Sequence, residues 1–117
     1  MKYTPADESE SAPAANPAAV ILEAIVKQQA IAATYNRTNV TLAPHILYTK
    51  HDELHVDAVT LDRDGKPPRE AKIGTFRLTG LGSLRITPRR FEVSELFNPA
   101  DPRYNDVTLM AVDTSGS

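Results

Sequence analysis

The chain has 117 residues, the length of one small domain, and its formal net charge is −2. It contains no cysteine, which excludes a disulfide framework, a cysteine metal site and a cysteine nucleophile. No apolar run approaches the length of a membrane span, and the acidic N-terminal residues do not have the pattern of a signal peptide. We therefore expect a cytoplasmic protein with no membrane partner.

The first segment is predicted to be a tail followed by a helix. Residues 1–15 are rich in Ala, Pro, Ser and acids, with too little apolar surface to offset the entropy cost of ordering, so we expect disorder there. A helix is predicted to begin at Asn16-Pro17, because Asn is a strong N-cap and Pro fits the first helical position. It should run to about Gln29 and dock its apolar stripe, which includes Ile21 and Ile25, on a sheet.

Short alternating runs then predict about five strands. These runs are Ile31–Tyr35, Val40–Thr49, 54–61, Ile73–Leu78 and Leu84–Thr87. Pro44 interrupts the second run and lacks an N–H donor, so a bend or an edge position is expected there. The order of a helix and then closely spaced strands predicts a mostly β (α+β) fold, with the helix packed on a small, partly closed antiparallel barrel.

Residues 54–86 are the centre of this pattern. The sequence DRDGKPP at 62–68 is dense in turn-forming residues and is predicted to reverse the chain. In the run after it, Phe76 and Leu78 share one face while Thr75 and Arg77 share the other. Strict alternation predicts one buried face and one solvent-exposed face, and we expect the functional site on the exposed one.

The last part of the chain is predicted to complete the domain. Gly80 and Gly82 are expected to bend the chain, because Gly tolerates a positive φ angle. The domain is assigned to residues 16–97 and a C-terminal extension to residues 98–117, with a late edge strand at Val107–Val112.

Charge is distributed unevenly along the chain. Between Arg63 and Arg90 there are eight basic residues against two acidic ones. Such a segment indicates a surface that faces an anion or an acidic partner, although scattered charge on a solvated sheet face gives the same count.

Motifs for metal binding and catalysis are weak. His51, Glu53, His55 and Asp57 share one parity and include metal-ligand types, but a solvated face is the better interpretation of HDELH, and no metal is assigned. DRDG lacks the closing Glu of a calcium loop, and Gly80-x-Gly82 is too short for a dinucleotide motif. No serine has a supporting nucleophile motif, so neither enzymatic activity nor a cofactor is expected.

The order of these elements resembles the WYL domain family. ILEAIVKQQAIAATY resembles its leading helix and first strand, LAPHIL its proline-containing second strand, and FRLTGL its aromatic–Arg–Leu run. The resemblance covers about residues 20–91. The Trp-Tyr-Leu signature itself falls on Leu54, His55 and Val56, and the second arginine of the aromatic run falls on Gly80.

The resemblance implies an SH3-like or Sm-like barrel and a ligand-sensing role in transcriptional regulation, mostly in bacteria. The implied ligand is a small anion, a nucleotide or single-stranded nucleic acid, and regulation would occur in trans. The candidate ligand-binding residues are Arg77, Arg85, Tyr48, His45 and His55. If the strands of Arg77 and Arg85 pair, their like charges would oppose each other across the ladder unless an anion lies between them. The alternative is a protein-interaction module that self-associates as a homo-oligomer or binds an acidic protein through its sheet edges.

Overall fold

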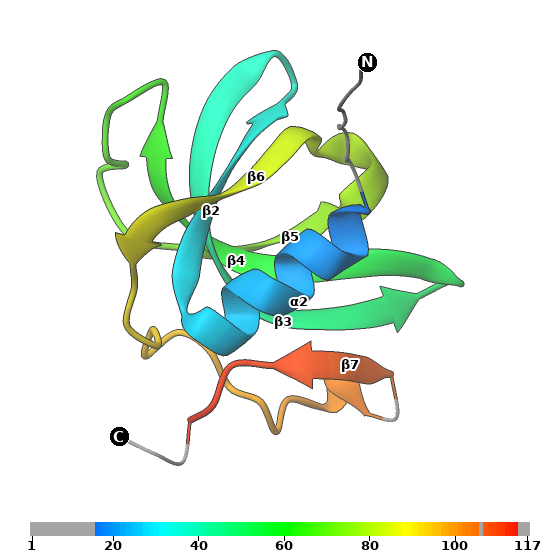
Figure 1. The fold of residues 1–117 in the computed structure, drawn as a ribbon. Coiled ribbons are helices and arrows are strands. Elements are labelled where there is room, and N and C mark those ends of the chain that lie inside the picture. The colour runs from blue at the N-terminus through cyan, green and yellow to red at the C-terminus, as the bar shows by residue number, and fades with distance from the viewer. Residues whose placement is uncertain (1–15, 106, 115–117) are drawn as a thin grey trace, which may run out of the picture.

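The computed structural model describes residues 16–105 and 107–114, so the predicted tail at 1–15 lies outside the described residues. The structure contains one α-helix and six strands among these residues (Figure 1). In chain order the elements are α2 (Pro17–Lys27), β2 (Gln29–Tyr35), β3 (Thr38–Lys50), β4 (Glu53–Arg63), β5 (Ile73–Arg77), the 3₁₀ helix η2 (Leu78–Gly80), β6 (Gly82–Arg90), the 3₁₀ helix η3 (Pro102–Tyr104) and β7 (Thr108–Ala111).

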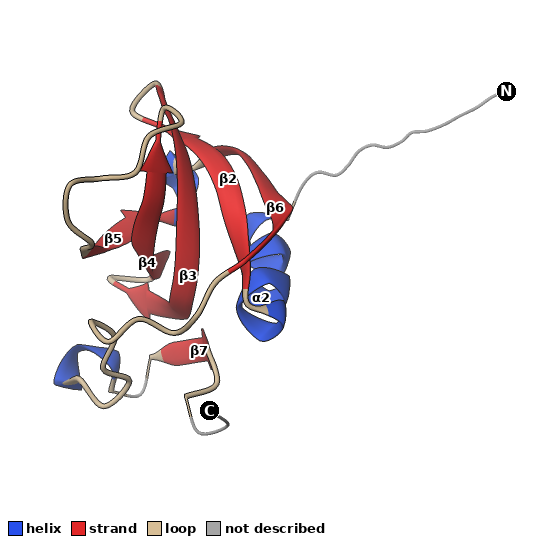
Figure 2. Ribbon diagram, turned by 90° about the vertical axis from the view of Figure 1, so that its left-hand side faces the viewer, coloured by secondary structure: helices blue, strands red, loops and turns tan. Residues whose placement is uncertain are grey.

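The helix begins where the sequence predicts. The Asn16 side chain accepts hydrogen bonds from the backbone N–H groups of Ala18 and Ala19, and Pro17 takes the first helical position. Gln28 ends the helix in the left-handed conformation, at φ +52°. The stripe that contains Ile21 and Ile25 is buried, and α2 packs on β2, β3 and β6. Figure 2 shows the helix lying along one side of the curved sheet.

All strand pairs are antiparallel, and the pairing order is β5-β4-β3-β2-β6, with β7 added to β3. The predicted mostly β architecture with a leading helix is therefore confirmed. The ends of this order, β5 and β6, do not pair with each other, so the sheet does not close into a barrel.

The long strand β3 organises the sheet. It pairs with β4 along most of its length, with β2 through Thr38–Leu42, and with β7 through Ile46–Tyr48. Pro44 lies between the β2-paired and β7-paired parts, and the β4 register shifts between Pro44 and Ile46. The β3–β4 ladder is therefore irregular at this proline, as expected for a residue without an N–H donor, although Pro44 still pairs with Ala58 of β4.

The turn after β4 is tighter than the predicted 62–68 segment. Asp64 and Gly65 have φ angles of +52° and +83°, and Arg63 and Lys66 exchange two backbone hydrogen bonds across them. Two successive positive φ angles are typical of the I′ hairpin turn, for which Asp-Gly is a preferred pair.

The predicted bend at Gly80 and Gly82 is present, but neither glycine has the positive φ angle given as its reason. The chain bends through η2, and the positive φ, +50°, belongs to Ser83, while Gly65 is the described glycine with φ in that region. The physical reason is that a single 3₁₀ turn redirects the chain with ordinary right-handed angles.

The prediction of one exposed face along β4 is wrong. Residues 55–59 are all buried, including His55 and Asp57. The segment after β6 covers them, because Phe97, Tyr104 and Val112 join the same hydrophobic core as the helix and sheet. The segment after residue 97 thus contributes Tyr104 and Val112 to the core of the domain, and the predicted late strand is present as β7. No described helix has the length and apolar character needed to cross a membrane.

Candidate functional site

The first candidate pocket lies at the end of β5. It has a volume of about 330 Å³ and is lined by Tyr35, Asn36, Thr75, Arg77, Thr79 and Gly80. We call it the Arg77 pocket. Its lining combines one guanidinium, two threonine hydroxyls, one amide and one phenol, and none of the six residues is acidic. Such a set donates hydrogen bonds to an anion from several directions.

The local sequence explains how these side chains come together. Asn36 and Arg37 form the turn between β2 and β3, with φ angles of +50° and +62°. This turn reverses the chain, so β3 runs back antiparallel to β2. The Tyr35 ring packs edge-on against Phe76 of β5, with ring centroids 5.1 Å apart. Gly80 lies beside the same ring: a Cβ built there would be 3.5 Å from a Tyr35 ring carbon, which is ordinary van der Waals contact.

Arg77 also forms an ion pair with Glu53 at the start of β4. Its Nε lies 2.9 Å from Glu53 Oε1 and its Nη2 lies 3.3 Å from Oε2. Both side chains are about half exposed, so water screens the pair. A guanidinium has five N–H donors and this pair uses two, so Arg77 keeps donors for a ligand.

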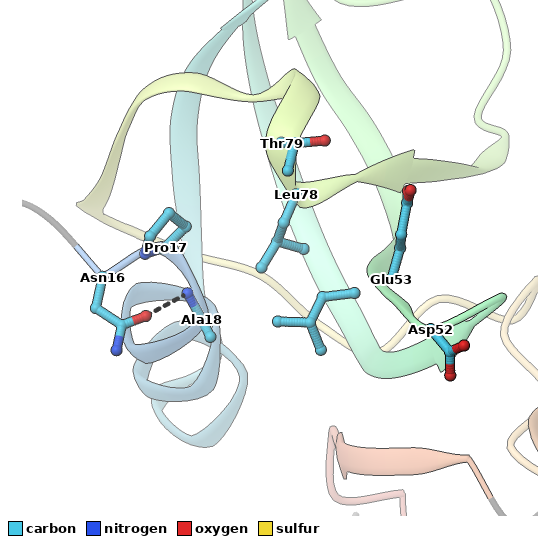
Figure 3. Close-up of a pocket in the computed structure, with 8 residues that line it drawn as sticks. Asn16, Pro17, Ala18, Asp52, Glu53, Leu78 and Thr79 are labelled. Carbon is cyan, nitrogen blue, oxygen red and sulfur yellow. Dashed lines mark hydrogen bonds between the residues drawn. The ribbon is translucent and has the colours of Figure 1, made fainter.

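A second pocket lies beside the first and is more apolar. It has a volume of about 390 Å³ and is lined by Asn16, Pro17, Ala18, Asp52, Glu53, Leu54, Leu78 and Thr79. Figure 3 shows Leu78 pointing into the space between the helix N-terminus and the β3–β4 turn, with Asp52 and Glu53 on the turn side. Thr79 lines both pockets, and the Glu53–Arg77 ion pair joins a residue of one to a residue of the other.

A buried polar cluster lies under the C-terminal segment. Asp57 is 1% exposed, and its Oδ1 accepts hydrogen bonds of 2.7 Å from both the Tyr48 and Thr75 hydroxyls. Its Oδ2 accepts a 2.5 Å bond from the Tyr104 hydroxyl and lies 3.7 Å from Arg103 Nη1. Hydroxyl donors and a nearby cation supply the partners that a buried carboxylate needs.

The same environment shifts the tyrosines. Burial raises the pKa of Tyr48 to about 12; the nearby Thr75 hydroxyl opposes this shift, and the bond to Asp57 acts in the same direction as burial. Burial, followed by the hydrogen bond to Asp57, also raises the pKa of Tyr104. Both phenols therefore remain protonated donors throughout the physiological range.

His45 forms a second buried contact with the C-terminal segment. Its Nε2 accepts the backbone N–H of Ser94 at 2.9 Å, so the proton lies on Nδ1, which donates to the Ala43 carbonyl at 2.8 Å. Its ring lies between Phe91 and Phe97, at centroid distances of 5.1 and 5.3 Å. Burial lowers the pKa of His45, against a smaller raising effect of the Ala43 bond.

The structure separates the five residues predicted to bind a ligand. Arg77 lines a pocket, whereas Arg85 is exposed on β6 and donates to the Ser83 carbonyl at 2.7 Å. His45, Tyr48 and His55 are buried, at 0%, 2% and 8% exposure.

The premise that the strands of Arg77 and Arg85 pair is wrong. β5 pairs with β4, and β6 pairs with β2, at the other end of the strand order. Arg77 instead lies opposite His55 in the β4–β5 ladder, and the His55 ring stacks on Tyr48 at 6.0 Å. Tyr48 and His55 therefore form part of the buried face rather than an open ligand surface.

Sequence reasoning missed Asp57 as the centre of a network. Its parity with Glu53 and His55 was visible, but the pattern suggested solvated side chains. The missed partner, Tyr104, lies 47 residues away in a polar loop with two prolines, where no periodic pattern predicts burial. No group of three or more metal-ligating side chains is found within the described residues.

Comparisons with known proteins give no match. No protein-family model matches the chain, and neither the curated proteins nor the solved structures contain a match to it. The function proposed below therefore rests on the residues of this chain and on the resemblance noted in its sequence.

Proposed function

We propose that the chain is a ligand-sensing domain of the WYL type, and that it binds a small anionic molecule in the Arg77 pocket. The observation that carries this proposal is the presence of Arg77 in a cavity of about 330 Å³ with no acidic lining residue. The volume is at the lower end of the range typical of small-molecule sites. The strongly bent sheet with a leading helix is compatible with an open SH3-like or Sm-like architecture, and regulation of transcription in trans follows from the resemblance.

The chemistry favours a phosphate or carboxylate group as the anchor of the ligand. A guanidinium binds such planar or tetrahedral anions through two parallel N–H bonds. The Thr75 and Thr79 hydroxyls and the Asn36 amide lie in the same lining and can donate to the remaining oxygens. Tyr35 offers a ring face or edge to an attached base, which makes a nucleotide a suitable member of this class.

Glu53 is expected to lower the affinity of the pocket for an anion. In the absence of a ligand its carboxylate holds Arg77, at 2.9 Å, and an incoming anion has to compete with it. Because both groups are about half exposed, this competition costs little. Removal of the carboxylate should therefore raise the affinity for an anion, whereas removal of the guanidinium should lower it.

A panel of probes tests the proposal. Thermal unfolding of the full chain is followed with inorganic phosphate, pyrophosphate, ADP, acetate and a single-stranded oligonucleotide, at matched ionic strength. We expect the phosphate-bearing probes to raise the melting temperature, because a ligand that binds the folded state stabilises it by mass action. If none of the probes shifts the melting temperature or gives heat in calorimetry, the proposed function is contradicted.

The alternative, a protein-interaction module, has one specific observation in its favour. β5 and β6 each pair with a single strand among the described residues, so each presents a sheet edge. However, β6 contains Pro88 and three arginines, which are residues that block strand addition, and β5 has five residues. Light scattering on size-exclusion fractions tests this alternative: a stable oligomer that is lost when β6 residues are changed would favour it over anion binding.

A further inference from the structure

Thr75 belongs to two sites at once. It lines the Arg77 pocket, and its hydroxyl donates a 2.7 Å hydrogen bond to Oδ1 of the buried Asp57 carboxylate. A hydroxyl has one proton to donate. If Thr75 donates to an anion in the pocket, it cannot donate to Asp57 at the same time.

The second carboxylate oxygen of Asp57, Oδ2, is bound by the C-terminal segment. This oxygen accepts the Tyr104 hydroxyl at 2.5 Å, and Tyr104 is the last residue of η3. Four residues later the chain begins β7, which pairs with β3 at Ile46–Tyr48. We call residues 98–105 and 107–112 the C-terminal arm. The Tyr48 hydroxyl shares Oδ1 with Thr75, so the same carboxylate contacts β3, β5 and the arm.

We infer that the C-terminal arm responds to occupancy of the Arg77 pocket, and that the signal passes through Thr75, Asp57 and Tyr104. This inference rests on the proposed function, because it assigns a responding element to the same anion site. A ligand-sensing domain needs an element whose stability depends on the ligand. The arm is expected to be such an element of low local stability, because its strand β7 has only four residues and two of them are exposed, with Leu109 54% accessible to solvent.

The direction of the effect follows from counting donors. When an anion recruits the Thr75 hydroxyl, Asp57 loses one of its three hydroxyl donors and depends more on Tyr48 and Tyr104. The Tyr104–Asp57 hydrogen bond therefore contributes more free energy to holding the arm on the sheet, and the arm should open less often. By thermodynamic reciprocity, weakening the arm's bond should make Asp57 retain Thr75 more strongly and so reduce affinity for the anion.

Hydrogen exchange on the full chain tests the forward direction, with pyrophosphate as the probe. We expect saturating pyrophosphate to slow exchange of the β7 amides by about fivefold, which is at the low end of measured couplings between sites. Thr75→Val should bind pyrophosphate more weakly, and at a concentration that saturates the variant its β7 exchange should be the same with and without pyrophosphate. Thr79→Val is the matched control: Thr79 lines the same pocket but has no hydrogen bond to Asp57 in the described structure, so its loss should weaken binding and still leave β7 exchange slowed at saturation.

Calorimetry of the Tyr104→Phe variant tests the reverse direction without altering the pocket. We expect its affinity for pyrophosphate to fall by the same factor of about five, because the coupling is reciprocal. Unchanged affinity in Tyr104→Phe, or unchanged β7 exchange in a wild-type protein that binds pyrophosphate, would overturn the inference and leave the proposed function intact. Absence of binding by the wild type would instead contradict the proposed function, and the inference would fall with it.

Discussion

The hydroxyl of Tyr104 donates a 2.5 Å hydrogen bond to Oδ2 of Asp57, a residue 47 positions earlier in the chain. Both residues are buried, and the bond joins the C-terminal arm to the middle of the sheet. The sequence predicts a C-terminal extension after residue 97. In the structure, this bond attaches that segment to β4 as part of the domain.

Removal of this hydroxyl should destabilise the domain. Tyr104→Phe keeps the ring contacts with Tyr48 and Phe97 but deletes a donor to a buried carboxylate, which costs about 1.5–3 kcal/mol. Urea unfolding followed by far-ultraviolet circular dichroism measures the change. Tyr35→Phe is the control, because the Tyr35 hydroxyl has no hydrogen bond within the described structure, and its effect should stay below about 0.5 kcal/mol. Equal effects of the two variants would show that the Tyr104–Asp57 bond adds no stability.

Alkaline conditions should destabilise the domain through the tyrosines. The pKa of Tyr48 is raised to about 12 and that of Tyr104 is also raised, both from the ordinary value of 10. The unfolded chain therefore releases these protons at lower pH than the folded chain. The contribution to the free energy of unfolding is complete below pH 10 and declines as pH rises from 10 toward 12. Unfolding free energies measured across this window should fall less steeply in Tyr48→Phe, and equal slopes would contradict the assignment.

Acidic conditions should weaken the attachment of the segment after β6. The pKa of His45 is lowered from 6.5, so its contribution is present above 6.5 and is lost as pH falls through the lower pKa of the folded state. Protonation would place a proton on Nε2, which accepts the Ser94 N–H, and would put a charge between Phe91 and Phe97. Comparing wild type with His45→Phe isolates this residue from the other titrating groups. The wild type should lose more stability than the variant over that window, and parallel pH profiles would refute the role of His45.

The elements that the sequence predicts well are those with local signals. Asn16-Pro17 defines the helix start through capping chemistry, Asp64-Gly65 defines a turn, and Phe76 and Leu78 are buried as their alternation predicts. The exposure of Arg77 could also be predicted, because consecutive strand residues point to opposite faces and its neighbour Phe76 is buried.

The rest depended on contacts between distant parts of the chain. Whether β5 pairs with β6 or with β4 is decided by how the whole sheet packs, and no local pattern carries that information. His55 and Asp57 have the polarity of an exposed face, and they are buried because Tyr104 and its neighbours cover them. A buried carboxylate surrounded by hydroxyls is a long-range arrangement that periodicity does not reveal.

The charge pattern is the clearest example of a partial prediction. The basic residues between Arg63 and Arg90 suggested one anion-facing surface. In the fold, Arg77 pairs with Glu53 and Arg89 pairs with Asp62 at 2.9 Å, while Arg63 and Lys72 line a separate cavity of about 230 Å³ together with Glu70. The segment is therefore divided among several local environments, and the lining of the Arg77 pocket contains no acidic residue, although Arg77 is also paired with Glu53 beside it.

The most direct test of the central claim is calorimetric titration of pyrophosphate into four matched proteins: wild type, Arg77→Ala, Arg85→Ala and Glu53→Gln. Arg77→Ala removes the guanidinium from the pocket and should weaken binding by about tenfold or more, as expected for lost hydrogen bonds to a charged group. Arg85→Ala removes the same charge from an exposed strand outside that lining and should change affinity by less than about twofold. Glu53→Gln frees Arg77 from its carboxylate and should tighten binding. Equal affinities in the wild type and Arg77→Ala, or equal losses in Arg77→Ala and Arg85→Ala, would show that Arg77 is ordinary surface charge and that this pocket is not an anion site.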